Sequence, residues 1–454
     1  MAPAVIIGGG ISGLSTAYYL NKSGVPAVLI EKNSHLGGVI RTEHVEGCVV
    51  EGGPDSFLSI KPWALDLIRD LGLTSEVIHS NDATRKTFVW KRGRMTPLPD
   101  GLQLMVPTRI LPMVTTPLLG WGTKIRMGLE WFRRPSGQVA HDRSVAEFIA
   151  DHYGQEAVDY LAEPLLAGVY GGDPALLSVS SVLARFVELE RRYGSLTKGT
   201  LAERRKATGP SAPLFTSLKA GMGQLVEALV KATGAATRTV RGQAEAIERT
   251  GRGFRVRVSG EWIDARHAVI ATEAHRAAPL LGGMDGAMAE GLASVPYNSS
   301  VTVAFAFGAD SFAAPPAGFG FLVPKCERER MVACTYVGNK FGHRVSGGAV
   351  LVRCFLGGGP IAESDDAIVS GVLDELREKA GARGAPKWWR LYRIPQSMAQ
   401  YTVGHARRIE ETEARAAAVP GLHLAGNAYH GIGVPDCVRM GKQAAEQVRA
   451  ALDD

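Results

Sequence analysis

Residues 4–24, AVIIGGGISGLSTAYYLNKSG, decide the fold of this chain. The apolar start predicts a short buried strand, and the next three spaced glycines, Gly8, Gly10 and Gly13, form the pattern G-x-G-x-x-G. Between a strand and a helix, the first glycine permits a tight turn and the second lets the backbone approach a pyrophosphate. The third lets the helix pack on the strand. The apolar helical face after Gly13 ends at Gly24.

A carboxylate follows at the distance that nucleotide binding requires. Glu31 closes the next apolar strand, AVLIE (27–31), about 20 residues after the glycines, where a carboxylate binds ribose hydroxyls. A glycine pair, Gly37–Gly38, then precedes Arg41, and EGGPDSF (51–57) comes soon after. A second glycine-rich backbone suits a ligand that extends beyond its pyrophosphate, so these residues favour FAD over NAD.

Composition limits the remaining possibilities. A chain of 454 residues, 45% of them hydrophobic, is expected to form two or three domains. The net charge of +6 suits a carboxylated substrate or an anionic membrane surface, or is an ordinary basic surface. We expect no nucleic-acid partner, because zinc-ligand spacing and lysine tracts with interleaved aromatics are missing from the sequence. Five scattered cysteines without CxxC predict a reducing compartment, no disulfide framework and no metal site.

The sequence predicts a cytoplasmic protein that associates with a membrane only at its surface. We expect no targeting segment at the N-terminus and no transmembrane helix, because no run of about 18 uncharged apolar residues occurs. Residues 98–121 are apolar but broken by prolines, and Arg126, Arg133 and Arg134 follow. This stretch is expected either to lie on a membrane surface or to pack over a substrate cleft. Residues 191–213, rich in Arg and Lys, are predicted to be a loop.

Motifs at both ends of the chain resemble one family. The pattern GGGISGL…E…LGGVIRT…GGPDSF, together with QYTVGH (400–405) and NAYHGIGVPD (427–436), resembles the FAD-containing amine oxidase superfamily. Within it, the chain is most similar to the oxygen-dependent protoporphyrinogen oxidases, because two residues separate the glycine pair from Arg41. Two departures are Ala399, where the family usually has proline, and Asn427, where many members carry an acid.

The resemblance implies an α/β and α+β fold in three parts. A discontinuous Rossmann-like FAD-binding domain would comprise residues 1–80, 210–295 and 389–454. A mixed-sheet substrate-binding domain would comprise 81–91 and 296–388. A helical, membrane-associated insertion would comprise 92–209.

The same resemblance implies the cofactor contacts. FAD is expected to bind along the glycine turns, a valine on a neighbouring strand, and the start of the last helix. These residues are Gly8, Gly9, Gly10, Ile11, Ser12, Gly13, Glu31, Lys32, Gly38, Val39, Arg41, Gly53, Pro54, Asp55, Ser56, Val240, Ile432, Gly433 and Val434.

The implied reaction is the six-electron oxidation of protoporphyrinogen IX to protoporphyrin IX in haem biosynthesis, with O₂ as acceptor and H₂O₂ as product. No side chain is expected to be catalytic, because the flavin carries the chemistry and the protein supplies position and a dry pocket. The substrate ring would contact Gly168, Phe319, Leu322, Val332 and Phe355. Gln103 stands where eukaryotic relatives have an arginine that meets a propionate, and Arg109 or Arg94 could replace it.

Other functions stay open at this stage. The nearest is a coproporphyrinogen III oxidase that forms coproporphyrin, whose four-carboxylate substrate would suit the basic charge. An amine or carotenoid oxidase is a third reading, although NAYHG offers only Tyr429 in place of an aromatic pair. A non-catalytic module that has lost its cofactor is a fourth, against which the intact glycine turn and Glu31 argue. The chain is compatible with a homodimer, but its sequence does not determine the oligomeric state.

Overall fold

The computed structural model describes residues 3–135, 141–206, 213–312, 314 and 316–453. Its first layer is a parallel five-stranded sheet in the order β12-β2-β1-β16-β22. The strands are β1 (Ala4–Ile7), β2 (Ala27–Glu31), β12 (Thr237–Arg241), β16 (His267–Ile270) and β22 (Leu422–Leu424). Strands from the start, middle and end of the chain therefore form one sheet, as a discontinuous Rossmann-like unit requires.

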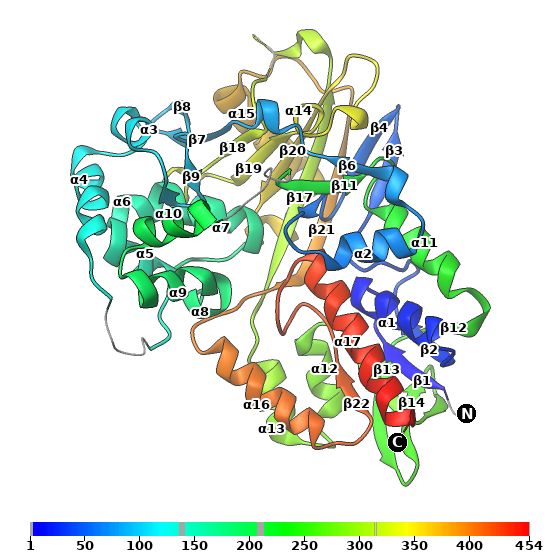
Figure 1. Ribbon diagram of the computed structural model, residues 1–454. Coiled ribbons are helices and arrows are strands. Elements are labelled where there is room, and N and C mark those ends of the chain that lie inside the picture. The colour runs from blue at the N-terminus through cyan, green and yellow to red at the C-terminus, as the bar shows by residue number, and fades with distance from the viewer. Residues whose placement is uncertain (1–2, 136–140, 207–212, 313, 315, 454) are drawn as a thin grey trace.

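Helices cover this parallel sheet (Figure 1). Helix α1 (Ile11–Lys22) packs against α17 (Val434–Asp453) and α11 (Gly223–Thr233), so residues far apart in sequence become neighbours. The other helices of this part are α2 (Trp63–Asp70), α12 (Ala274–Leu281), α13 (Gly286–Ala293) and α16 (His405–Ala417). Three small sheets adjoin them: β3 (Thr42–Val45) with β4 (Cys48–Glu51); β5 (Phe57–Leu58), β11 (Phe215–Leu218) and β6 (Val77–His79); and β13 (Ala244–Thr250), β14 (Gly253–Val258) and β15 (Glu261–Ala265).

The second layer is a mixed seven-stranded sheet in the order β21-β17-β20-β19-β18-β7-β8. One face packs on α15 (Asp365–Ala380), whose Ile368, Val372 and Leu376 join the buried core there. The short helix α14 (Val337–Lys340) follows β19. The strands are β7 (Thr87–Lys91), β8 (Arg94–Pro97), β17 (Tyr297–Phe307), β18 (Gly320–Leu322), β19 (Met331–Tyr336), β20 (Val350–Leu356) and β21 (Trp388–Ala399).

This sheet extends beyond the segments predicted for the substrate-binding domain. β8 lies in the stretch assigned to the helical insertion, yet it pairs with β7. Most of β21 lies in the stretch assigned to the FAD-binding domain, yet it pairs with β17 along most of its length. Strand pairing between distant segments decides such limits, and composition does not reveal it.

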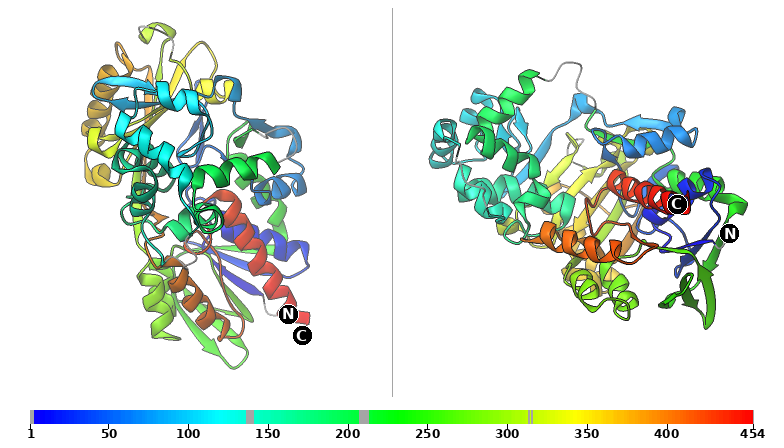
Figure 2. Two further views of the ribbon diagram at one scale, coloured as in Figure 1. Left: turned by 60° about the vertical axis from the view of Figure 1, so that its left-hand side comes forward. Right: turned by 60° about the horizontal axis from the view of Figure 1, so that its bottom comes forward.

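A cluster of helices forms the third part, at the left of Figure 1 and set apart from the parallel sheet in both views of Figure 2. Helix α7 contacts β18 and β19 and so joins the cluster to the seven-stranded sheet. A two-stranded ribbon, β9 (Leu102–Gln103) and β10 (Val106–Pro107), leads into it. The helices are α3 (Ile110–Thr115), α4 (Trp121–Leu129), α5 (Val145–Tyr153), α6 (Gln155–Ala157), α7 (Glu163–Tyr170), α8 (Val179–Val182), α9 (Ala184–Tyr193) and α10 (Leu196–Lys206).

The loop predicted for residues 191–213 is wrong for most of its length, because α10 occupies Leu196–Lys206. Residues 207–212 lie outside the described residues. Contacts with distant residues stabilise this helix. The Glu130 carboxylate accepts the Leu196 N–H (2.5 Å) and the Ser195 hydroxyl (2.8 Å) at its N-terminus, and Gly199 lets it approach Leu189 of α9. These contacts are tertiary, so a local count of charges misses them.

Candidate functional site

The turn between β1 and α1 requires its glycines at two positions and leaves a third open. A Cβ at Gly8 would lie 2.7 Å from the Ala271 oxygen, and one at Gly13 would lie 1.9 Å from the Gly8 oxygen. A Cβ at Gly10 would meet no atom within 4 Å. Space therefore lies beside Gly10 at the N-terminus of α1, where N–H groups and the helix dipole favour an anion.

Glu31 holds this turn as well as closing β2. Its Oε2 accepts the Gly9 N–H at 2.7 Å, and its Oε1 accepts the Asn33 N–H at 2.7 Å. The side chain is buried, and each oxygen still has a free lone pair for a ligand hydroxyl. Val240 pairs with Ile30 on the adjacent β2, so the structure brings it close to Glu31.

The second glycine turn lies on the first. The Gly37 N–H donates to the Gly9 oxygen at 2.8 Å, and a Cβ at Gly38 would lie 3.2 Å from the Gly10 Cα. Arg41 is exposed and its Nε donates to the His35 ring at 3.1 Å. The predicted contact residues of the two turns are therefore neighbours, and backbone packs closely on backbone at Gly38 while the space beside Gly10 stays open.

A third loop, 53–56, packs on the second turn. A Cβ at Gly53 would lie 1.8 Å from the Val39 oxygen. The Asp55 carboxylate accepts Lys340 Nζ at 3.0 and 3.1 Å, and Arg353 donates to the Gly53 oxygen at 2.7 Å. Burial would raise the pKa of Asp55, but the charges of Lys340 and Arg353 hold it below its ordinary value.

These cations belong to a buried ionic cluster behind the loop. Arg344 is fully buried and lies 3.1 Å from Glu51, whose pKa is raised by burial despite that charge. The cluster thus joins two carboxylates, Glu51 and Asp55, to three cations, Lys340, Arg344 and Arg353. Sequence reasoning missed all three cations. Their only signal was a charged residue inside otherwise apolar stretches, such as AVLVRCFLGG.

The turn before α17 completes the set. Ile432 and Gly433 precede Val434, the first residue of α17. A Cβ at Gly441 of the same helix would lie 2.4 Å from the Ser12 oxygen of α1, so the two helices cross in close contact. Helix α17, whose first residue is Val434, therefore packs on helix α1, whose N-terminus follows the first glycine turn.

Two of the predicted substrate residues, Gly168 and Leu322, meet where α7 contacts the seven-stranded sheet. A Cβ at Gly168 would lie 3.9 Å from Leu322 of β18, which is ordinary contact. The strand neighbours of Leu322 and Phe355 face the α15 core; they are Phe321, Cys354 and Leu356. Leu322 and Phe355 therefore point to the opposite side of the sheet. Val332 sits at a bulge in β19, and Phe319 just before β18 is buried.

The sixth predicted substrate residue is Gln103. It pairs with Val106 in the β9–β10 ribbon. Arg109, which is exposed, packs along Gly101, and Arg204 of α10 donates to the Thr108 hydroxyl at 3.2 Å. Two guanidinium groups therefore lie at the open end of the ribbon, whereas Gln103 lies beside its turn. Sequence reasoning missed Arg204, because residues 191–213 were predicted to be a loop.

Comparison with known proteins places the chain in context. The family model described as flavin containing amine oxidoreductase matches residues 11–449. A coproporphyrinogen III oxidase of Bacillus subtilis (strain 168) is 32% identical over 99% of this chain and 98% of that protein. A protoporphyrinogen oxidase of Macaca fascicularis is 28% identical over 98% of each chain. A crystal structure of a candidate protoporphyrinogen oxidase from Exiguobacterium sp. 255-15 has a TM-score of 0.87 and 29% identity, covering 100% of this chain and 99% of that one.

Proposed function

The chain belongs to the flavin-containing amine oxidoreductase family, and FAD is its cofactor. We propose that it oxidises coproporphyrinogen III to coproporphyrin III. The observation that carries the proposal is end-to-end similarity to the Bacillus subtilis relative named coproporphyrinogen III oxidase. The sequence had favoured protoporphyrinogen IX. That substrate is the second candidate, supported by the name of the Macaca fascicularis relative.

The residues present fit FAD. Gly10 leaves space at a helix N-terminus, Gly13 and Gly53 allow backbone to approach backbone where a Cβ would overlap, and Gly38 packs closely on Gly10. In the proposed arrangement, Glu31 and Val240 hold the adenosine end and the α1 turn holds the phosphates. The 53–56 loop and Ile432–Val434 hold the flavin end.

FAD held by these residues would supply the hydride acceptor for three two-electron oxidations of the porphyrinogen, with three O₂ taking up the electrons as three H₂O₂. The chain orients the macrocycle and excludes water. Gly168 brings helix backbone close to the ring, and Leu322, Val332 and Phe355 supply an apolar wall. A dry, positioned site is what a cofactor-borne reaction needs from its protein.

The carboxylate count of the substrate gives a physical reason for the preference. Coproporphyrinogen carries four propionates and protoporphyrinogen two, and guanidinium groups bind carboxylates in a matched, bidentate geometry. Arg109 and Arg204 lie at the open end of the ribbon that carries Gln103, and Arg94 on β8 is also exposed. We infer that Arg109 and Arg204 bind propionates of the substrate. Gln103 is uncharged and cannot form an ion pair with them.

The test is anaerobic mixing of the FAD-loaded protein with each porphyrinogen, followed by admission of air. Flavin bleaching and then porphyrin fluorescence are expected with coproporphyrinogen III, at a kcat/KM at least tenfold above that for protoporphyrinogen IX. A preference for protoporphyrinogen IX would reverse the assignment. A yellow protein that neither substrate bleaches would exclude both.

Peripheral membrane association is proposed on an exposed apolar surface of the helical cluster. Trp121, Ile125 and Leu129 lie along one side of α4, and Ile110 of α3 is 84% exposed. Among the described residues, no helix is long and apolar enough to span a bilayer. Such a surface suits shallow insertion at an anionic interface.

Sedimentation with anionic liposomes at low salt tests this association. Ile110→Asn is expected to weaken binding severalfold. Ile60→Asn, at an equally exposed residue outside that surface (80%), is expected to leave binding unchanged. Equal behaviour of the two variants, or no sedimentation of the native protein, would refute the membrane proposal. The predicted homodimer stays a prediction.

A further inference from the structure

The hydroxyl of Tyr401 ties together the turn that precedes α17. It donates to the Asn427 oxygen at 2.7 Å and accepts the Gly431 N–H at 2.7 Å. Tyr401 is buried, so neither partner has water as a ready substitute. One oxygen atom therefore fixes both ends of the 427–431 turn, whose last residue leads directly into Ile432.

Gln400 and Tyr401 also contact residues on the proposed substrate side of the molecule. The Gln400 side chain donates to the oxygen of Tyr170, the last residue of α7, at 2.8 Å. The Tyr401 carbonyl accepts the Ser178 N–H at 2.7 Å. Helix α7 carries Gly168, so Gln400 and Tyr401 connect the proposed substrate wall to the turn before α17.

A stacked histidine holds the Tyr401 ring in place. The rings of Tyr401 and His405 are 4.0 Å apart and inclined by 12°. Burial lowers the pKa of His405 to about 4, which keeps the imidazole neutral at pH 7. His405 Nε2 lies 3.4 Å from the Tyr429 oxygen, so this ring also touches the turn.

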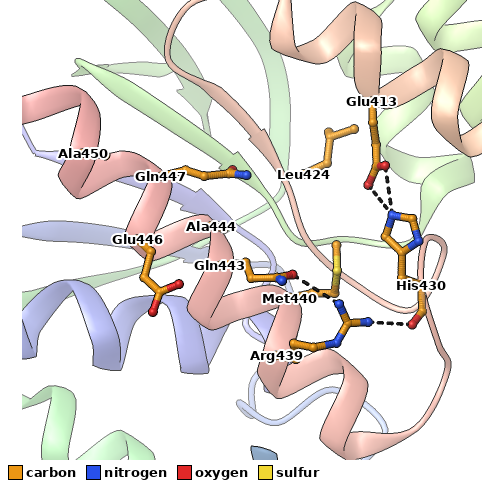
Figure 3. Close-up of a pocket in the computed structure, with 10 residues that line it drawn as sticks. All are labelled: Glu413, Leu424, His430, Arg439, Met440, Gln443, Ala444, Glu446, Gln447 and Ala450. Carbon is orange, nitrogen blue, oxygen red and sulfur yellow. Dashed lines mark hydrogen bonds and ion pairs between the residues drawn. The ribbon is translucent and has the colours of Figure 1, made fainter.

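The outer side of the turn has its own supports, at the groove drawn in Figure 3. His430 Nε2 lies 2.8 Å from Glu413 of α16, and Arg439 of α17 donates to the His430 oxygen at 2.8 Å. These contacts are partly exposed to solvent, whereas the Tyr401 contacts are buried. Tyr401 is therefore the inner support of the turn, where water cannot replace a lost bond.

We propose that Tyr401 is a positioning residue for FAD. Its hydroxyl sets the backbone of the 427–431 turn, so that Ile432, Gly433 and the amino-terminal end of α17 meet the flavin in a fixed geometry. Gln400 sets α7 in the same way on the substrate side. The proposal concerns the cofactor and holds whichever substrate the enzyme oxidises.

Tyr401→Phe tests the proposal, because it removes one oxygen and keeps the ring that stacks on His405. The matched control is Tyr429→Phe. Tyr429 is equally buried in the same turn, but its hydroxyl has no hydrogen-bond partner among the described residues. Three readouts need no substrate: the FAD dissociation constant of the apoprotein, the visible spectrum of the bound flavin, and its midpoint potential.

For Tyr401→Phe we expect FAD binding about tenfold weaker, which corresponds to about 1.4 kcal/mol, with a shifted flavin spectrum and potential. Tyr429→Phe should match the native protein in all three. Unchanged values for Tyr401→Phe, or equal changes in both variants, would overturn the proposal. Should Tyr401→Phe not fold, His405→Ala frees the Tyr401 ring and must shift the spectrum in the same direction.

Gln400→Leu separates the two sides of this connection. It removes the bond to Tyr170 and leaves the Tyr401 hydroxyl in place. KM for the porphyrinogen is expected to rise severalfold while the flavin spectrum and potential stay native. A changed spectrum with an unchanged KM would contradict the division of roles between Gln400 and Tyr401. Failure of both porphyrinogens as substrates would leave the Tyr401 readouts intact and would count against the proposed function alone.

Discussion

Replacing Gly10 by Ala should remove FAD binding without harming the fold. The Gly10 backbone has φ −68°, which alanine adopts freely, and a Cβ there meets no protein atom within 4 Å. The cost to the apoprotein should be below about 1 kcal/mol, the ordinary loss when glycine at a helix N-cap becomes alanine. The proposed pyrophosphate would occupy the space that the methyl group enters. Overlap there should weaken FAD binding at least a hundredfold, or about 2.7 kcal/mol.

The assay is titration of the apoprotein with FAD, followed by quenching of flavin fluorescence, beside urea unfolding of the apoprotein. Gly13→Ala is the matched control, because a Cβ there would lie 1.9 Å from the Gly8 oxygen. Such overpacking should cost about 1–3 kcal/mol or more in apoprotein stability. Native FAD affinity in Gly10→Ala would refute the placement of the phosphates, and equal destabilisation of both apoproteins would refute the reasoning from space.

Three further predictions follow from single contacts. Glu31→Gln should weaken FAD binding about tenfold and lower apoprotein stability by about 1–3 kcal/mol, because it sets an amide donor against a buried N–H; native values in titration and unfolding would contradict both roles of Glu31. Lys340→Met should lower the free energy of unfolding by about 3 kcal/mol, because Arg353, at 3.5 Å, would be the ion-pair partner left to Asp55 among the described residues; a urea midpoint equal to the native one would count against the buried cluster. His405 has its pKa lowered from 6.5 to about 4 by burial, so the unfolded chain takes up its proton first and stability should fall between pH 6.5 and 4, by up to about 3 kcal/mol. Unfolding of His405→Gln should show a shallower loss of stability between pH 6.5 and 4, and an unchanged slope would contradict the assignment.

The glycine turn before α1 could be predicted from the sequence, because its requirements are local. Gly8, Gly10 and Gly13 lie within one strand–turn–helix unit, and glycine, which lacks a Cβ, can be identified directly in the sequence. Glu31 was predicted as a ribose ligand from its spacing alone. The hydrogen bond between Glu31 and the Gly9 N–H was not predicted, because the spacing of two segments does not specify how they meet. The helix α10 was mistaken for a loop, since the carboxylate of Glu130 that holds its start comes from 65 residues earlier.

The charged and hydroxyl groups that support the cofactor turns could not be predicted from the sequence, because packing alone brings them together. Lys340, Arg344 and Arg353 have no shared spacing, and they meet Asp55 and Glu51 because β20 and α14 pack behind the 53–56 loop. Tyr401 was noticed as part of a motif, but its bonds to Asn427 and Gly431 depend on how the end of β21 crosses the turn before α17. Consecutive residues specify a backbone turn. A buried polar contact between distant segments forms only after packing has excluded water and left each group a single partner.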